Sequence, residues 1–310
     1  MQVIYQNTSV PLQSCAVTVG FFDGVHRGHK YLLDELKTLA RLKGLQSMVV
    51  TFASHPRKVL DSGYMPDLLT SLSEKISLIE RCGIDYCMVL SFTEQMAMLS
   101  ASEFMAEYLL KICHAKTLLV GHDHRFGHNR NDAFAEYRAY GSALGMDVFQ
   151  ASIFSDPINH IISSSRIRNV LRQGDVELAN TMLGHDFNIK GNVVSGFKVG
   201  RKIGFPTANI QPDDPDKLIP GLGVYAVEAK YTDVVYHGMM NVGVRPTLSK
   251  EQKVSIEVNL FDFDQDIYHQ VLEVRLRYRI RDEVGFKTID ELISRLKADK
   301  KMAIELLNRK

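Results

Sequence analysis

Residues 20–29 read GFFDGVHRGH and combine glycines with two histidines at a spacing that suits phosphate chemistry. An apolar run precedes the segment and a helical pattern follows it. Helix N-termini carry unpaired N–H donors and a partial positive charge, so phosphates bind there. His26 and His29 are three residues apart, so both imidazoles lie on one side of the first turn and could stabilise charge on a phosphate. The segment is neither GxGxxG nor a P-loop, and two surface histidines at an ordinary helix start remain the alternative.

A second run, ISSSRIR at residues 162–168, places hydroxyls just before an expected helix and arginines after them. Hydroxyls at a helix N-terminus exchange hydrogen bonds with phosphate, and Arg168 supplies a planar charged fork. Taken alone, the run is explained better by an ordinary serine N-cap followed by a solvated arginine.

A third segment, GRKIGFPTAN at residues 200–209, carries a hydroxyl and an amide two positions apart. In an extended chain Thr207 and Asn209 face the same way. Their oxygens are hard ligands that suit Mg²⁺ already carrying ATP phosphates. Spacing alone favours the simpler interpretation, a Gly/Pro loop with two polar residues facing water.

Glu257 is the remaining candidate for chemistry. Val254 to Phe261 alternates, so that apolar residues share one face of a strand and Glu257 lies on the other. A solvated sheet face is the default interpretation. The functional one is a general base that takes the proton from a primary hydroxyl as it attacks a γ-phosphate.

Strand and helix patterns alternate along the first half of the chain, which predicts a parallel sheet with helices on its faces. The expected strands cover residues 15–19, 47–52, 86–92 and 116–120, and the expected helices 31–43, 71–83, 100–112 and 132–144.

The second half changes to a period of two. Its expected strands cover residues 191–195, 223–231, 236–242, 254–261 and 271–281. Helical stripes are absent until a terminal helix that begins at Thr288. Such strands, joined by Gly/Pro/Asp-rich loops, predict an antiparallel β-barrel. The change of rhythm divides the chain into domains at 1–184 and 185–310.

Composition fits two globular domains in a cytoplasmic protein. The chain has 310 residues, of which 45% are hydrophobic and 24% charged. A net charge of +1 argues against a nucleic-acid partner, and the arginines between 275 and 281 alternate as on one strand face. Four cysteines without a CxxC pair are expected to be reduced thiols. We find no leader pattern and no run of ~20 apolar residues, so we expect no membrane association.

Together, the first two motifs resemble the HxGH and ISSTxxR pair of the nucleotidyltransferase superfamily. The stretches TFASHPRKVL, LLTSLSEKISLIERCGIDY, VLSFTEQMAMLSASEF and VGHDHRFGHNRND are similar to the adenylyltransferase half of the prokaryotic bifunctional riboflavin kinase/FMN adenylyltransferases, or FAD synthetases. The resemblance implies a Rossmann-like nucleotidyltransferase domain that binds ATP. The implied ATP-site residues are Gly20, Asp23, Gly24, His26 and His29, with Ser163, Ser164 and Arg168 on the triphosphate and Asp123, Arg125, Asn129 and Arg130 near the flavin phosphate.

The second half resembles the riboflavin kinase part of the same family through GNVVSGFKVGRKIGFPTANI, KLIPGLGVYAVEA, MMNVGVRPT and VSIEVNLFDFDQDIYHQVLEV. The resemblance implies that Thr207 and Asn209 bind Mg-ATP and that Glu257 is the catalytic carboxylate. It also places Gly200 and Lys202 in a loop near the nucleotide, and residues 281–286 near the flavin.

The resemblance implies two ATP-dependent reactions. Riboflavin would be phosphorylated to FMN, and FMN would then be adenylylated to FAD with release of pyrophosphate. Mg²⁺ would accompany ATP, and no tightly bound prosthetic group or covalent enzyme intermediate is expected. The expected partners are riboflavin, FMN and ATP, and the sequence leaves open whether the chain forms a homo-oligomer.

The chain departs from the family pattern at five positions. The five are Phe21 for a frequent Asn, His124 for Phe, Ser165 for Thr, Asn259 for His and His269 for Gly. The first two could alter how tightly nucleotide or flavin is held. Because the histidines and Arg168 remain, we expect activity to be retained.

Three alternatives stay open at this point. His122, His124 and His128, with the two histidines of the first motif, could form a zinc site, although no cysteine lies nearby in sequence. One half of the enzyme could be inactive. The chain could also be a flavin-binding or regulatory protein without catalysis, but binding alone does not need Glu257.

Overall fold

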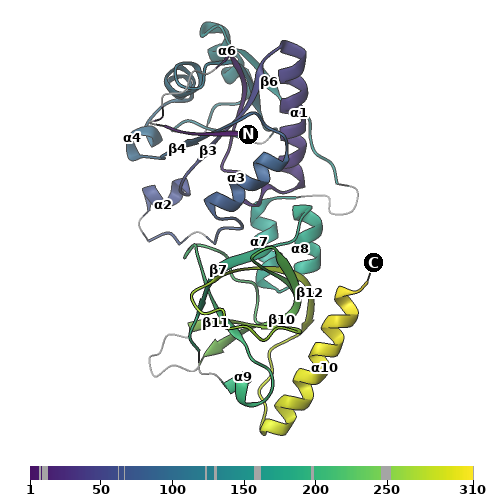
Figure 1. Ribbon diagram of the computed structural model, residues 1–310. Coiled ribbons are helices and arrows are strands. Elements are labelled where there is room, and N and C mark those ends of the chain that lie inside the picture. The colour runs from purple at the N-terminus through teal and green to yellow at the C-terminus, as the bar shows by residue number, and fades with distance from the viewer. Residues whose placement is uncertain are drawn as a thin grey trace. The chain divides into compact units, whose positions relative to one another are not determined.

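The computed structural model describes residues 1–6, 8, 13–61, 63–65, 67–122, 124–128, 131–156, 162–196, 199–245 and 253–309. The chain forms two compact units, Met1–Ser163 and Ser164–Lys310. Figure 1 shows a sheet with helices in the first unit, and a barrel with a long terminal helix in the second.

The first unit contains a six-stranded sheet in the order β1-β4-β3-β2-β5-β6, and all of its strand pairs are parallel. Its strands are β1 (Gln2–Tyr5), β2 (Cys15–Val19), β3 (Gln46–Phe52), β4 (Tyr86–Leu90), β5 (Ala115–Val120) and β6 (Asp147–Gln150). The predicted parallel sheet is therefore confirmed.

Helices cover both faces of this sheet, because its central strands are apolar on both sides. All five residues of β2 are buried. Val17 belongs to one hydrophobic core and Ala16 to another. Helices α1 (Arg27–Lys43) and α3 (Leu72–Arg81) contribute to the core of Ala16, and α5 (Ala101–Phe104), the π-helical turn η2 (Met105–Leu110) and α6 (Phe134–Ala143) contribute to the core of Val17.

Local sequence signals set the helix starts. Ser71 and Ser100 both form the predicted capping boxes, at the first residues of α3 and α5. The helix expected from Tyr31 begins at Arg27, because His26 caps it.

The second unit contains a closed antiparallel barrel in the order β10-β11-β8-β7-β12-β9, as predicted. Its strands are β7 (Asn188–Val194), β8 (Ala208–Pro212), β9 (Gly223–Tyr231), β10 (Val234–Arg245), β11 (Lys253–Leu260) and β12 (Val271–Arg281). The terminal helix α10 (Ile289–Leu307) is capped by Thr288 and packs on the barrel through Ala303.

The sequence patterns missed mostly short elements. The second half was expected to contain no helix before Thr288, but a one-turn helix at Val199–Lys202 precedes it. All but one of the missed elements have three to five residues, which are too few to display a period. The missed elements are β1, β6, β8, η1 (Asp23–Val25), α2 (Pro56–Leu60), α4 (Glu94–Ala97), α8 (Val176–Leu183) and α9 (Val199–Lys202).

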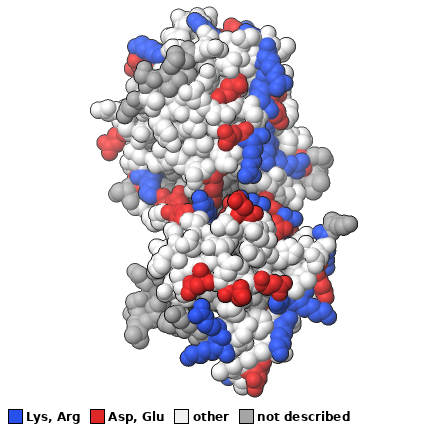
Figure 2. Space-filling model, viewed as in Figure 1, with Lys and Arg blue, Asp and Glu red and all other residues white. Residues whose placement is uncertain are grey.

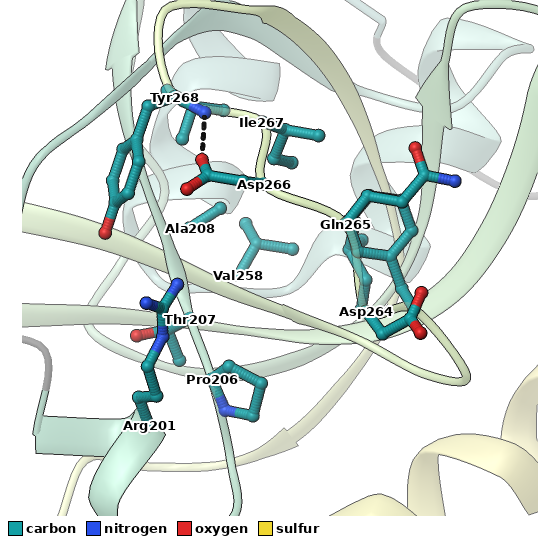
Figure 3. A pocket seen from close by; sticks show the side chains of 13 residues that line it. Arg201, Pro206, Thr207, Ala208, Val258, Asp264, Gln265, Asp266, Ile267 and Tyr268 are labelled. Atoms are coloured by element: carbon teal, nitrogen blue, oxygen red, sulfur yellow. Dashed lines mark hydrogen bonds between the residues drawn. The ribbon is translucent and has the colours of Figure 1, made fainter.

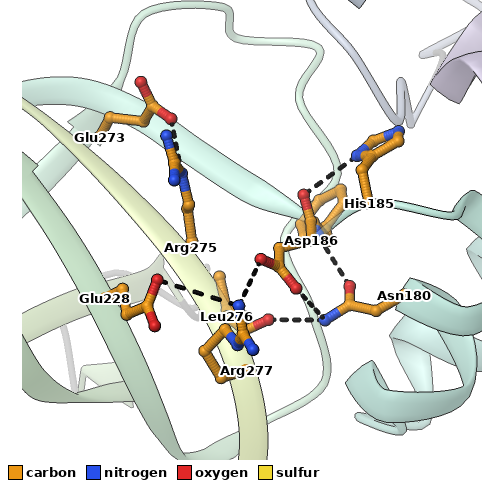
Figure 4. Close-up of polar contacts among 9 residues, drawn as sticks. Asn180, His185, Asp186, Glu228, Glu273, Arg275, Leu276 and Arg277 are labelled. Carbon is orange, nitrogen blue, oxygen red and sulfur yellow. Dashed lines mark hydrogen bonds and ion pairs between the residues drawn. The ribbon is translucent and has the colours of Figure 1, made fainter. Parts of the chain in front are cut away.

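The alternating arginines of β12 are engaged within the second unit. Arg277 pairs with Asp186 at 2.8 Å and lies 3.9 Å from Glu228, and Arg275 pairs with Glu273 at 3.0 Å (Figure 4). The same figure shows the amide of Asn180 on α8 bonded to β12. These arginines therefore stabilise the outer face of the barrel.

The division between the two units falls after Ser163. Helices α7 (Ser164–Arg172) and α8 thus group with the barrel, because α8 is bonded to β12. The domain boundary expected at 184/185 stays a prediction.

Candidate active sites

In the first unit, strand order locates the place where a ligand would bind. The chain proceeds from β2 to β3 on one side and reaches β5 on the other side of β2, so the order reverses between β2 and β5. In open α/β sheets, ligands bind beyond the carboxyl ends of the strands at such a switch point. The turn that carries His26 follows β2, and the loop that carries Arg125 follows β5.

The turn after β2 has a strained backbone. Phe22, Gly24 and Val25 have φ angles of 54°, 80° and 37°, all in the left-handed region. Such conformations cost on the order of 1–3 kcal/mol for residues other than glycine, and persist only where the surroundings enforce them. They cluster at functional sites.

Asp23 enforces this turn. Its carboxylate is 3% exposed and accepts hydrogen bonds from the backbone amides of Leu69 and Thr70 at 3.0 and 3.1 Å. The Thr70 hydroxyl in turn accepts one from the amide of Gly24 at 3.0 Å. Asp23 therefore ties the turn to residues 69–70, and its predicted contact with ATP stays a prediction.

The two histidines lie together at the start of α1. The Nδ1 atom of His26 accepts a hydrogen bond from the backbone amide of His29 at 3.3 Å, so the proton of a neutral His26 is on Nε2. The two rings stack, with centroids 3.6 Å apart. The sequence motif therefore does place both imidazoles on one side of the first helical turn.

His29 is held in its neutral form. Burial and the nearby His26, His124 and Lys75 lower the pKa of its imidazole well below the usual 6.5. Its Nδ1 atom is buried and has no hydrogen-bond partner among the described residues. An anionic phosphate would favour the charged form, so binding of ATP would raise this pKa.

The loop after β5 is described only in part. Asp123, Asn129 and Arg130 lie outside the described residues, so their predicted roles stay predictions. Arg125 lies in a segment fixed by Tyr137, whose hydroxyl accepts from the backbone amide of Phe126 at 2.9 Å and donates to its carbonyl oxygen at 3.1 Å.

The ISSSRIR run lies where the two units join. Ser163 ends the first unit, and Ser164 and Arg168 belong to α7 of the second. The hydroxyls thus stand at the start of a helix, as predicted. Contact of these residues with the triphosphate at His26 and His29 stays a prediction.

Two charged groups of the first unit were missed by sequence reasoning. Asp156 is 1% exposed and pairs at 2.6 Å with Arg27, which lies between the two histidines in the sequence. Lys75 is 2% exposed. A signal existed for Lys75, because it lies three residues after Leu72 and four before Ile79, on the apolar face of α3.

In the second unit, the three predicted residues come together. Glu257 on β11 and Asn209 on β8 are cross-strand partners. The Thr207 hydroxyl lies 3.5 Å from a carboxylate oxygen of Glu257. A hydroxyl, an amide and a carboxylate therefore offer the oxygen ligands that Mg²⁺ prefers.

A cavity of about 510 Å³ opens on one side of Thr207. Figure 3 shows Arg201 and Thr207 on one side of it, and the loop with Asp266 and Tyr268 on another. The Asp266 carboxylate accepts a hydrogen bond from the backbone amide of Tyr268 at 3.1 Å, which fixes the loop. Apolar side chains, including Val258 and Leu260, complete the lining.

A second cavity of about 240 Å³ shares Thr207 and contains Glu257. Its apolar part consists of Ile203, Phe205, Val224, Met239, Val284, Phe286, Leu292 and Leu296. Its polar part consists of Gly200, Thr207, Asn241, Glu257, Asn259, Arg281 and Glu283.

Asn259 and Arg281 shape this smaller cavity. The amide of Asn259 donates to the carbonyl oxygen of Pro206 at 2.7 Å, which anchors the segment before Thr207. Arg281 binds Asp299 of α10 at 2.7 Å and lies over the ring of Phe286, at 5.8 Å. The terminal helix therefore holds a wall of the cavity.

Gly200 and Lys202 lie on α9 rather than in a loop, a correction to the prediction. A one-turn helix leaves no periodic pattern in the sequence. A Cβ atom at Gly200 would collide with the carbonyl oxygen of Phe205. Arg201 lines the larger cavity, whereas Lys202 is exposed and lines neither of the two.

Three further observations concern the alternatives. Basic and acidic side chains are mixed over the face shown in Figure 2. Within the described ranges, no group of three or more His, Cys, Asp and Glu residues is arranged to hold a metal ion. None of the described helices is long and apolar enough to cross a membrane.

Comparisons with known proteins agree with this architecture. Residues 9–166 match the family model described as FAD synthetase, and residues 183–307 match the one described as riboflavin kinase. A crystal structure entitled macrolide-efflux protein, from Streptococcus pneumoniae, has a TM-score of 0.89 at 32% identity and covers 100% of both chains.

Two curated relatives carry the same name, bifunctional riboflavin kinase/FMN adenylyltransferase. The relative from Escherichia coli K12 is 36% identical over 303 residues, 97% of this chain and 96% of its own. The relative from Bacillus subtilis is 39% identical over 294 residues, 93% of this chain and 91% of its own. The similarity extends over both units, and the two family matches follow one another along the chain. The chain therefore belongs to the family of bifunctional riboflavin kinases/FMN adenylyltransferases.

Proposed function

We propose that the chain phosphorylates riboflavin to FMN in the second unit and adenylylates FMN to FAD at the turn after β2, using one ATP in each step. The observation that carries the kinase assignment is Thr207, which lines both cavities and lies 3.5 Å from Glu257. ATP, the phosphoryl donor, in the larger cavity and the acceptor hydroxyl of riboflavin in the smaller cavity would therefore meet beside the carboxylate of Glu257.

The two cavities suit different substrates. Arg201 and the apolar Val258 and Leu260 in the larger one fit a nucleoside triphosphate, with phosphates at the cation and the base on apolar surface. The smaller one pairs aromatic and aliphatic side chains with Glu257, which fits an isoalloxazine ring and a ribityl hydroxyl.

In the kinase step, Glu257 takes the proton from the ribityl 5′-hydroxyl. The oxygen attacks the γ-phosphorus of ATP, the bond from that phosphorus to the β–γ bridging oxygen breaks, and ADP leaves. Thr207 and Asn209 would hold Mg²⁺, which neutralises phosphate charge when bound. The amide of Asn209 is 8% exposed and lies opposite Glu257, so the donor set is fixed in place.

In the adenylylation step, an oxygen of the FMN phosphate attacks the α-phosphorus of ATP and pyrophosphate leaves. The Nε2–H of His26 donates a hydrogen bond to the charge that develops on the transferred group. His29, neutral before ATP binds, would gain a proton beside the polyphosphate. Ser163, Ser164, Arg168 and Arg125 would hold the phosphates of ATP and FMN, and no covalent enzyme intermediate is needed.

The test separates the two reactions in one chain. With riboflavin and MgATP, wild type should yield FMN and then FAD. His29→Ala should accumulate FMN, with adenylylation reduced ~10²-fold or more. Glu257→Gln should lose ~10²–10⁴-fold in riboflavin phosphorylation while still converting supplied FMN to FAD.

Two controls complete that test, a substitution of an exposed lysine and the removal of Mg²⁺ by a chelator. Lys111→Met removes an exposed cation and should leave both rates unchanged. Replacing Mg²⁺ by a chelator should stop FMN formation. Loss of both activities in either active-site variant, with the fold intact, would contradict the assignment.

We also infer a cytoplasmic location. All four cysteines lie within the described residues and are free thiols, which agrees with a reducing compartment. Cell fractionation with an antibody to the chain would test this, and recovery outside the cytoplasm would contradict it.

A further inference from the structure

Lys75 is a buried cation beside the candidate adenylylation site. It lies on α3, is 2% exposed, and its side chain extends between the carboxyl ends of two strands. Buried lysines are rare unless something holds the ammonium group. The holding groups here belong to the segments that build the turn.

The ammonium group contacts two carbonyl oxygens and one aromatic ring. Nζ donates to the carbonyl oxygens of Phe21 and Phe52, at 3.1 and 2.9 Å. It also lies 4.2 Å from the centroid of the Phe21 ring, within the range of a cation–π interaction. Phe52 ends β3, and Phe21 begins the strained turn after β2. Lys75 therefore joins the end of β3 to the start of the turn.

Charged and titratable groups face Lys75 from each neighbouring element. Burial lowers the pKa of its ammonium to about 8, against the opposing effects of Asp23 on the turn and Cys87 on β4. The ammonium also contributes to the low pKa of His29 on α1. Burial raises the pKa of Cys87 to about 11, so this thiol titrates well above Lys75.

We propose that Lys75 is a positioning residue for adenylylation: it locks the backbone of Phe21 to β3, so that the turn from Phe22 to Val25 presents His26 and His29 to ATP. The proposal rests on the proposed role of the histidines. Lys75 acts through the backbone, because its ammonium donates to two main-chain carbonyl oxygens and lies against the Phe21 ring.

The neutral amine would hold the turn less well. Hydrogen bonds from a charged donor are roughly twice as strong as those between neutral groups. The cation–π interaction disappears with the charge. Bound ATP brings negative charge and would favour the ammonium form. The loss at alkaline pH should therefore appear in kcat/KM for ATP, which reports the free enzyme, more than in kcat.

The experiment compares Lys75→Met with Lys111→Met in the full chain. Adenylylation is measured as pyrophosphate release from FMN and ATP, and riboflavin phosphorylation in the same preparation reports the barrel. We expect kcat/KM for ATP in adenylylation to fall at least tenfold in Lys75→Met, with the kinase rate within twofold of wild type. An adenylylation rate equal to that of Lys111→Met would overturn the proposal.

The pH profile distinguishes positioning from a general loss of packing. In wild type, kcat/KM for ATP should decline severalfold as pH rises past about 8, and this decline should be absent in Lys75→Met. A wild-type profile that is flat from pH 7 to pH 9.5 would overturn the proposal. This measurement needs no variant, so it decides even if Lys75→Met does not fold.

A second variant acts on the same carbonyl without touching Lys75. The Thr51 hydroxyl donates to the carbonyl oxygen of Phe21 at 3.1 Å. Thr51→Val keeps the shape of the side chain, and we expect a two- to fivefold loss in the same parameter. His29→Ala, assayed in parallel, separates the hypotheses. A loss in His29→Ala alone overturns the positioning role, and no loss in His29→Ala overturns the site itself.

Discussion

The two candidate sites differ in how far apart their parts lie along the chain. In the first unit, residues 20–29 supply the strained turn, the helix start and both histidines. In the second, Thr207 precedes β8, Glu257 lies on β11, Arg281 ends β12 and its partner Asp299 lies on α10. The turn and histidines of the first site are thus contiguous in the sequence, although Asp23 and Lys75 tie them to distant segments, whereas the second site is assembled by strand register and one terminal helix.

The two sites also differ in how their titratable groups are kept in one charge state. The first site keeps His29 neutral, because burial and, to a lesser degree, the nearby His26 and Lys75 lower the pKa of its imidazole. The second fixes its charges by pairing, as in Arg281 with Asp299. Burial makes a site sensitive to pH, whereas pairing makes it sensitive to the loss of either partner.

Of the four further tests that compare the two sites, Thr207→Val should have the largest effect. Removing a hydroxyl that contacts a charged group costs about 1.5–3 kcal/mol, so riboflavin phosphorylation should fall roughly 10- to 150-fold. Adenylylation of supplied FMN should not change. Thr181→Val, at an exposed position of α8, is the control and should leave both rates as in wild type. Equal losses in both reactions would show that the sites are not separate.

Asp299→Ala should have a smaller effect, limited to the flavin. Arg281 would lose the carboxylate that fixes it against Phe286. We expect KM for riboflavin to rise about tenfold, the kinetic equivalent of ~1.4 kcal/mol, with KM for ATP unchanged. Glu305→Ala on the exposed face of α10 is the control. An increase in both KM values would mean that the helix supports the whole barrel instead.

Gly200→Ala should reduce kinase activity severalfold. The new methyl group would meet the carbonyl oxygen of Phe205, and such overpacking costs about 1–3 kcal/mol. Gly285→Ala places a methyl group in open space, so its thermal unfolding should match that of wild type. Thermal unfolding of the two variants, compared with their kinase rates, checks this. A Gly200→Ala protein that matches Gly285→Ala would contradict the packing described around α9.

The smallest effect concerns alkaline stability, because all four cysteines lie in the first unit. Burial raises the pKa of Cys87 to about 11 and that of Cys15 and Cys113 to about 12, from 9.0. Above pH 9 the unfolded chain loses these protons first, so the free energy of unfolding of this unit falls as pH rises. Lys75 has the opposite sign, because its pKa is lowered to about 8, so it offsets most of this loss up to about pH 9.5 and the net loss appears above that pH.

Heating at about pH 10.5 and assaying at pH 7.5 would check the sign. Adenylylation should be lost at a lower temperature than riboflavin phosphorylation. The raised pKa of Tyr225, about 12 from 10.0, acts in the same direction on the second unit, but there it is one group against three cysteines in the first. Loss of both activities at one temperature would contradict the expected difference.

Sequence patterns predicted most of the strands and the helices that carry sites. The bounds of β9 and β12 are those expected, because long alternating runs have a clear period of two. The strand β8 was missed, because five residues ending in Pro212 show little alternation. The contiguous motif of His26 and His29 could be recognised, since neighbours in sequence are neighbours in space.

The remaining parts depend on tertiary contacts that no local pattern encodes. Nothing in the sequence near Thr207 indicates that it separates two cavities, and nothing near Asp156 indicates its pairing with Arg27. Lys75 could have been noticed as a charge on an apolar helix face. Its carbonyl partners could not, because they depend on where β2 and β3 end.

Thr207 has a consequence for how the two kinase substrates bind. One side chain is a wall of both cavities, so a ligand that shifts its rotamer in one changes the shape of the other. Occupancy of the cavities is then thermodynamically linked. Whatever factor ATP imposes on the affinity for riboflavin, riboflavin must impose on the affinity for ATP.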